Sequence, residues 1–109
     1  MMLPDAERAS VDRAKITDYL LSLSHPDGSS KAAFFMRFGF RTEDWETLAA
    51  ALKEVGTSNP VTDSVESPHG TRYTVDGSLR SPDGRAPRVR TVWIVDSGNL
   101  PRLITAHPL

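Results

Sequence analysis

The spacing of apolar residues along the chain changes at Asn59-Pro60. Before this point, apolar residues recur at intervals of three and four positions, which is the pattern of amphipathic helices with one buried face. After it, apolar and polar residues alternate over short segments, as they do in half-buried strands. The chain is therefore predicted to form helices first and a sheet second.

Three helices are predicted in the first half. Their apolar stripes run over Ala14 to Leu23, Ala32 to Phe38 and Trp45 to Val55. Each stripe follows a polar residue suited to cap the first turn of a helix, namely Asp12, Ser29 or Ser30, and Thr42. Each is followed by glycine or proline, which end helices: His25-Pro26-Asp27-Gly28, Gly39 and Gly56.

Four strands are predicted in the second half, at about Val61 to Glu66, Arg72 to Leu79, Val89 to Val95 and Arg102 to His107. The first has few apolar residues, which is typical of an edge strand. The third has apolar residues on both faces, which indicates a central strand. Turn residues separate the strands, at His69-Gly70, Pro82-Asp83-Gly84 and Ser97-Gly98-Asn99.

The expected fold class is α+β, with two or three N-terminal helices packed on one face of a four-stranded antiparallel meander. We expect a single domain over residues 1–109, with a helical half at about 10–56 and a sheet half at about 60–108. No segment is predicted to cover the second face of the sheet. This open face is the expected place for a ligand or a partner.

Composition excludes several classes of function. The 109 residues include 13 Lys and Arg against 14 Asp and Glu, and a net charge of -1 argues against binding nucleic acid or membranes through bulk charge. The chain has no cysteine, so it has no disulfide, thiol nucleophile or thiolate zinc site. His25, His69 and His107 lie far apart in the sequence, so neither a metal nor another cofactor is expected. No run is apolar enough to span a membrane and residues 1–10 lack the core of a signal peptide, so a cytoplasmic protein is expected.

The segment from His25 to Lys31 is the first candidate for chemistry. A turn that leads into a helix presents free N–H groups and a partial positive charge, and Lys31 adds a full charge beside them, so the segment suits a phosphate. Histidine is the residue type best suited to exchange protons at physiological pH, so His25 could donate or accept one. The alternative is a plain connection between two helices, in which proline and glycine only shape the turn.

Basic and hydroxyl side chains in the predicted strands form a second set of candidates. Arg72, Arg90 and Arg102 could grip a phosphodiester through the planar guanidinium group. For Arg90 the favoured alternative is an ion pair with Asp76 or Asp63 on the sheet surface. The hydroxyls of Thr91 and Thr105 could meet on the open face and bind a phosphate or ribose oxygen, or both residues could serve only as good strand formers.

Five motifs, in order, carry a resemblance to a known family. They are Leu3-Pro4-x-Ala6-Glu7-Arg8-Ala9, His25-Pro26-x-Gly28-x-x-Lys31-Ala32-x-Phe34-Phe35-x-x-x-Gly39-Phe40, Gly70-x-Arg72-Tyr73, Thr91-Val92-Trp93-Ile94-Val95 and Pro101-Arg102-Leu103-Ile104-Thr105-Ala106-His107-Pro108. Together they resemble a bacterial domain-of-unknown-function family, DUF6883, over nearly the whole chain. His107 departs from the pattern, in which a tyrosine is expected.

The resemblance implies a small protein encoded beside another small protein, as in toxin–antitoxin pairs. The order of helices and strands, with its Thr-Ala-Tyr-Pro-like last strand, also resembles the ribonucleases of the barnase, EndoU and RelE type. This second likeness is an analogy of fold, which alone does not fix a function.

Two functions from different classes are considered. The first is a metal-independent ribonuclease toxin, with His25 as acid or base, Lys31 and Arg72 on the phosphate, Arg102 as a second clamp and Thr105 as an orienting hydroxyl. Arg90, Thr91 and His107 are further candidate contacts with RNA, and His107 is also an alternative base. The second is a non-catalytic module, an antitoxin or accessory subunit, that binds a small neighbouring protein through the open sheet face or an edge strand.

Overall fold

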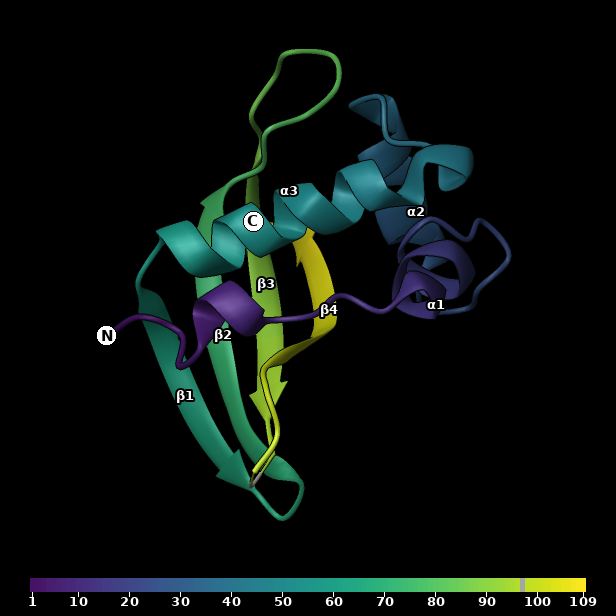
Figure 1. Cartoon of the computed structure of the whole chain (residues 1–109). Helices are drawn as coiled ribbons and strands as arrows, with labels where there is room; N and C mark the ends of the chain where they lie inside the picture. Colours follow the sequence, from purple (N-terminus) through teal and green to yellow (C-terminus); the bar gives the residue numbers. More distant parts are fainter. Residues whose placement is uncertain (97) are drawn as a thin grey trace.

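The four strands form one antiparallel sheet in chain order (Figure 1). The structure is a computed structural model and describes residues 1–96 and 98–109. Each strand pairs with the next along the chain: β1 (Val61–Ser67), β2 (Gly70–Ser78), β3 (Arg88–Val95) and β4 (Arg102–Pro108). The predicted meander is confirmed, and so is the α+β fold class.

The helices precede the sheet in the chain. A 3-10 turn at Ala6–Arg8 comes first, and α1 (Arg13–Lys15) then runs directly into a π-helical turn at Ile16–Leu20. They are followed by α2 (Ser29–Arg37), a 3-10 turn at Thr42–Asp44 and α3 (Trp45–Ser58). The long helix α3 crosses one face of the sheet, whereas α1 and α2 lie beside β4 (Figure 1). The helical layer thus extends past the β4 edge.

The first helix is shorter than its apolar stripe predicts. It ends in the π-helical turn, where the backbone N–H of Leu21 donates to the carbonyl of Ile16 at 2.8 Å. Leu23 lies beyond the helix and is 62% exposed. Gly28 comes close to the end of this helix, and a Cβ there would lie 2.2 Å from the carbonyl oxygen of Tyr19. Glycine lets the His25 turn fold back against the end of the helix.

The predicted helix caps are confirmed only in part. Asp12 does occupy the N-cap position of α1, but its side chain makes no cap hydrogen bond, and the N-cap position of α2 is Gly28, which has no side chain. Ser29 is already the first residue of α2. Gly56 does not end α3, which continues to Ser58. Gly56 instead allows α3 to pack closely against the sheet, because a Cβ at this position would lie 2.5 Å from the Trp93 ring.

The core lies between α3 and the sheet and continues under α1 and α2. Its largest fully buried side chains are Trp93, Phe35, Phe40, Ile16, Leu20, Leu48 and Leu52. The buried stripe of α3 is close to the predicted one, with Leu48, Leu52 and Val55 inside. The core therefore joins both halves of the chain, and Trp93 fills its centre as expected from the sequence.

The turns of the sheet half follow the turn residues of the sequence. In the Pro82-Asp83-Gly84 turn, Gly84 has a φ of 87° and its N–H donates to Ser81 at 3.0 Å. Of the predicted Ser97-Gly98-Asn99 turn, Ser97 lies outside the described residues. None of the helices within residues 1–96 or 98–109 combines the length and apolar character that crossing a bilayer requires.

Candidate functional site

The register of the sheet determines which side chains point away from α3. Trp93 faces α3, so its neighbours Val92 and Ile94 point to the opposite face. Residues paired side by side in a sheet share a face. The open face therefore carries two rows of side chains, Thr74-Val92-Thr105 and Arg72-Ile94-Arg102.

A bulge in β4 brings Arg102 and Thr105 to this same face. The two residues are three positions apart, so strict alternation would put them on opposite faces. The pairing of β3 with β4 shifts between Val92 and Trp93, which leaves Ile104 without a partner. This one extra residue turns Thr105 outward, away from the core.

Tyr19, Lys31 and Thr105 meet beside the β4 edge of the open face, and we call them the Tyr-Lys-Thr cluster. The Lys31 ammonium group donates to Oγ1 of Thr105 at 3.0 Å and to the hydroxyl of Tyr19. The two hydroxyl oxygens are 2.9 Å apart. All three side chains are part-buried, so the cluster is open to solvent. An ammonium group beside two hydroxyls can bind an anionic oxygen.

Tyr19 is the member that the sequence did not reveal. Its place in the apolar stripe of the first helix predicted only a core residue. The charges of two lysines surround its ring, since the ammonium groups of Lys31 and Lys15 lie 4.8 and 5.4 Å from the ring centroid. The only sequence signal for a role in the site was that Tyr19 borders the polar face of the helix and precedes Lys31 by 12 residues.

The surroundings of Tyr19 lower the pKa of its hydroxyl. Burial by itself raises the pKa of the Tyr19 hydroxyl. The hydrogen bonds from Lys31 and Thr105, together with the positive charges of Lys31 and Lys15, outweigh burial and hold that pKa below its ordinary value.

His25 lies next to the cluster, with its ring edge-on to Tyr19 at a centroid distance of 5.0 Å. Its Nδ1 accepts hydrogen bonds from the backbone N–H groups of Asp27 and Gly28, at 3.0 and 3.1 Å. A neutral ring in this arrangement carries its proton on Nε2. Only Nε2 is then available to a ligand, as a donor.

The same hydrogen bonds occupy part of the predicted phosphate cradle at the start of α2. The N–H groups of Asp27 and Gly28 donate to His25 Nδ1, and the N–H of Ser29 donates to the carbonyl of His25 at 3.0 Å. These three donors are not free to bind an anion. Of the predicted segment, the side chains of His25 and Lys31 and the backbone N–H groups of Ser30 and Lys31 remain as candidate contacts.

Arg102 and Arg72 both lie on the open face, and Arg72 is further from the cluster than Arg102. Arg102 is on β4, and its guanidinium group is 3.6 Å from the Asp96 carboxylate in an exposed ion pair. Arg72 is exposed on β2 and has no ion pair within the described residues. With strands about 4.8 Å apart, Arg72 lies roughly 10 Å across the sheet from β4. Arg72 therefore does not join the Tyr-Lys-Thr cluster.

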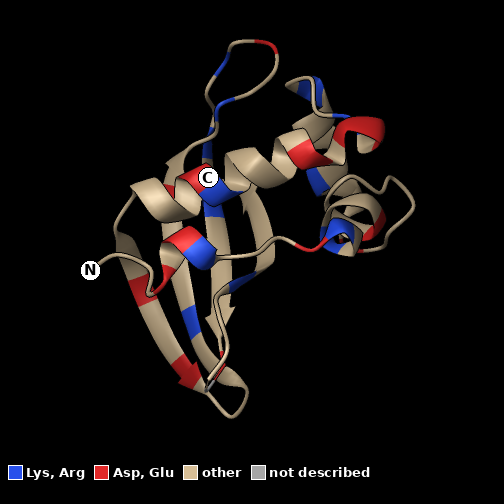
Figure 2. Cartoon of the chain, in the orientation of Figure 1, with Lys and Arg blue, Asp and Glu red and all other residues tan. Residues whose placement is uncertain are grey.

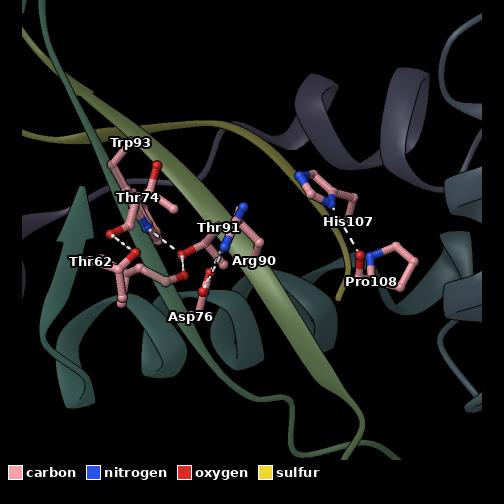
Figure 3. Close-up of polar contacts among 9 residues, drawn as sticks. Thr62, Thr74, Asp76, Arg90, Thr91, Trp93, His107 and Pro108 are labelled. Atoms are coloured by element: carbon pink, nitrogen blue, oxygen red, sulfur yellow. Dashed lines mark hydrogen bonds and ion pairs between the residues drawn. The ribbon is translucent and has the colours of Figure 1, made fainter. Parts of the chain in front are cut away.

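Arg90 and Thr91 have structural partners (Figure 3). The Arg90 guanidinium group donates to both carboxylate oxygens of Asp76, at 2.8 and 3.0 Å, which confirms the ion-pair alternative. The fully buried Thr91 hydroxyl donates to the carbonyl of Val75 and accepts from the indole of Trp93, each at 2.8 Å. Thr91 faces α3, so its expected meeting with Thr105 on the open face does not occur.

His107 lies near the end of β4, level with Arg90 in β3. Its Nδ1 is 3.1 Å from the carbonyl oxygen of Pro108 (Figure 3). His107 points to the same face as Thr105 and lies one row beyond it, on the side away from Arg102. Within the described residues, no hydrogen bond joins His107 to the Tyr-Lys-Thr cluster. The structure thus joins Lys31 to Thr105 by a hydrogen bond, places His25 against Tyr19, and leaves His107 on the same face as Thr105 in the next row.

The fold and this edge cluster define an α+β protein with a polar, cationic site beside an open sheet face. The chain belongs to the family described as "Domain of unknown function (DUF6883)", whose model matches residues 2–109. The resemblance found in the sequence motifs is thereby confirmed at the level of the family.

A solved structure has a similar fold. It is a contact-dependent growth inhibition toxin–immunity protein complex from Klebsiella pneumoniae 342, of which one chain superposes with a TM-score of 0.72. The sequences are 17% identical, and the match covers 96% of this chain and 97% of that chain. At this identity the likeness shows the fold alone. No curated protein matches the sequence.

Proposed function

We propose that this protein is a metal-independent endoribonuclease and the toxin of a two-protein module. The observation that carries the proposal is the meeting of Lys31 with Thr105, 74 residues apart in sequence, at the edge of an open sheet face. An ammonium group fixed by two hydroxyls beside a face that carries arginines is suited to a phosphodiester.

The distribution of charge supports a polyanionic substrate despite the net charge of -1. Acidic residues lie on α3 and at its start (Figure 2), and Asp63 and Asp76 lie on the open face, where Asp76 pairs with Arg90. The arginines of the sheet, Arg72, Arg88, Arg90 and Arg102, all alternate onto the open face. Local charge of this kind can bind RNA when the whole molecule is nearly neutral.

The similar fold of a chain in a toxin–immunity complex supports the module. That complex contains both a toxin and an immunity protein, so a small partner protein is part of the proposal. We assign this chain to the toxin because the polar cluster places groups that can stabilise a reacting phosphate on a solvent-accessible surface. An immunity protein has no need of such an arrangement.

Each candidate residue receives a role from its position. Lys31 would stabilise the negative charge of the pentacoordinate phosphate, and the Thr105 hydroxyl would orient the Lys31 ammonium group by accepting its hydrogen bond. His25 would donate from Nε2 to a second oxygen. Arg102 would bind the next phosphate along β4, and Arg72 one further across the open face.

The test is cleavage of RNA by the purified protein in the presence of a chelator. We expect cleavage by the wild type, and loss of at least about 100-fold in rate for Lys31→Ala combined with His25→Ala. Lys53→Ala, on α3, is the matched control and should cleave at the wild-type rate. Melting curves of all variants check that the fold is retained. Equal rates for the double variant and the control would contradict the assigned site.

Growth of a bacterial host tests the proposed biological role. Induction of the wild type alone should arrest growth, and the double variant should not. Co-expression of the protein encoded beside it should relieve the arrest. Intact RNA together with normal growth would reject the toxin and favour the alternative, a non-catalytic subunit that binds a small protein.

A further inference from the structure

We propose that the Tyr19 hydroxyl is the general base of this ribonuclease and takes the proton from the ribose 2′-hydroxyl. This inference rests on the proposed function, and it assigns a residue that the sequence motifs leave out. It starts from geometry: the oxygen of Tyr19 lies within hydrogen-bond distance of both Lys31 and Thr105.

The arrangement is complementary to an ionised tyrosine. Lysine can only donate, so the Tyr19 oxygen accepts from the Lys31 ammonium group. The Thr105 hydroxyl, at 2.9 Å, can donate to the same oxygen. Two donors then converge on one phenol oxygen, which is the environment that stabilises a phenolate. The direction of the Tyr19 pKa shift agrees with this geometry.

The other candidate bases are poorly placed. The Nδ1 of His25 is held by the two N–H groups of its own turn, and a neutral ring then has its proton on Nε2. His107 faces the carbonyl of Pro108 and is not bonded to the cluster within the described residues. Lys31 acts as a donor to both hydroxyls. Tyr19 is thus the acceptor at the point where the positive charge meets the open face.

The proposed reaction is a transesterification within the RNA. The 2′-hydroxyl loses its proton to the Tyr19 phenolate as its oxygen forms a bond to phosphorus. The bond from phosphorus to the 5′-oxygen breaks, and the departing oxygen takes a proton from solvent. The products are a 2′,3′-cyclic phosphate and a 5′-hydroxyl. Tyr19 returns its proton to solvent before the next turnover, so the step needs no other reactant.

The part-buried position of Tyr19 suits this role. The side chain is close enough to solvent for a ribose to approach, and its ring is fixed between His25 and the two lysines. A phenylalanine in this place keeps the ring contacts and removes only the hydroxyl. The chain also offers a matched control, because Tyr73 on β2 is the second tyrosine and packs against the core.

The experiment compares wild type, Tyr19→Phe and Tyr73→Phe on an RNA oligonucleotide in chelator. Removal of a general base costs about 100- to 10,000-fold in rate, and we expect this loss in kcat for Tyr19→Phe with little change in KM. Tyr73→Phe should cleave at the wild-type rate. The wild-type products should end in a 2′,3′-cyclic phosphate, and an oligonucleotide with 2′-deoxyribose at the cleavage position should remain intact.

The pH profile gives a second readout that does not depend on Tyr19→Phe folding well. The acidic limb of kcat/KM reports the base of the free enzyme. Thr105→Val removes a hydrogen bond to the phenolate, so the limb should move to higher pH. Unchanged cleavage by Tyr19→Phe, an unshifted limb in Thr105→Val, or products with 3′-hydroxyl ends would overturn Tyr19 as the base while the ribonuclease stands. A wild type that leaves RNA intact would overturn both proposals.

Discussion

Thr91 and Trp93, two residues apart in β3, are joined by a hydrogen bond of 2.8 Å on the covered face of the sheet. The Thr91 hydroxyl in turn donates a hydrogen bond to the Val75 carbonyl in β2, also at 2.8 Å. The polar group of the largest core residue is thus satisfied by a buried hydroxyl, and that hydroxyl by the backbone of the next strand. This chain of bonds explains why a polar residue occupies a fully buried position in the central part of the sheet.

Thr91→Val should lower the free energy of unfolding without affecting the candidate site. Valine has nearly the shape of threonine, but it leaves the Trp93 indole N–H without a partner in the core. The expected loss is about 1–3 kcal/mol, measured by urea denaturation. Thr105→Val is the control on the open face, where solvent can replace the lost hydroxyl. Equal losses in the two variants would contradict the distinction between the faces.

Replacement by alanine should affect stability at Arg90 and RNA binding at Arg72. Arg90→Ala leaves the Asp76 carboxylate without its two hydrogen bonds, and we expect about 1–3 kcal/mol less stability with RNA binding retained. The measurement is denaturation together with RNA affinity for each protein.

Arg72→Ala should leave stability close to the wild type and weaken the binding of RNA. Its guanidinium group has no ion pair within the described residues, so its loss removes only a phosphate contact. The slope of log affinity against log salt should fall by roughly one. An unchanged slope would place Arg72 outside the RNA contact.

The Arg90–Asp76 pair should also make stability depend on pH. The hydrogen bonds from Arg90 hold the pKa of the Asp76 carboxyl below its ordinary value, in spite of an opposing effect of burial. A group with a depressed pKa stabilises the folded protein above its unfolded pKa of about 3.9, and this contribution is lost as pH falls through the lower folded value. The loss should therefore begin below about pH 5. Asp76→Asn should be less stable at pH 7 and show a smaller decline towards pH 3, as followed by urea denaturation.

Gly56→Ala should destabilise the protein even though alanine favours helices. The added Cβ would lie 2.5 Å from the Trp93 ring, so α3 or the indole must move. Overpacking of a core typically costs about 1–3 kcal/mol, which exceeds the helical gain of about 1 kcal/mol. The solvent-exposed Ala50 on the same helix provides a control: Ala50→Gly should cost only the difference in helix propensity.

The fold was predictable because each half of the chain has its own period. Helical spacing up to Val55 and alternation after Asn59-Pro60 are local signals, and meander order follows from short connections between strands. The early end of the first helix was not predictable, since the apolar stripe continues to Leu23 beyond the last helical residue, Leu20. The contact of Gly28 with the carbonyl of Tyr19 was not predictable either, because a contact across a turn does not affect the spacing of apolar residues.

The site was predictable only in part, because its residues come together through contacts between distant parts of the chain. Lys31, Thr105 and His25 stood out by residue type, and the structure places them together. Tyr19 resembled a core residue because its ring does belong to the helical stripe, while its hydroxyl reaches a strand 86 residues away. Thr91 and Thr105 lie on opposite faces of the sheet. Thr105 shares the open face with Arg102 because one residue of β4, Ile104, has no partner in β3.

The distance along the chain between Tyr19 or Lys31 and Thr105 has a consequence for folding. Tyr19 and Lys31 precede α3 and Thr105 lies on β4, so the three groups meet only when the helical half has packed against the sheet. A partly folded molecule, with either half formed alone, therefore has no Tyr-Lys-Thr cluster. The cluster is a property of the completed tertiary structure.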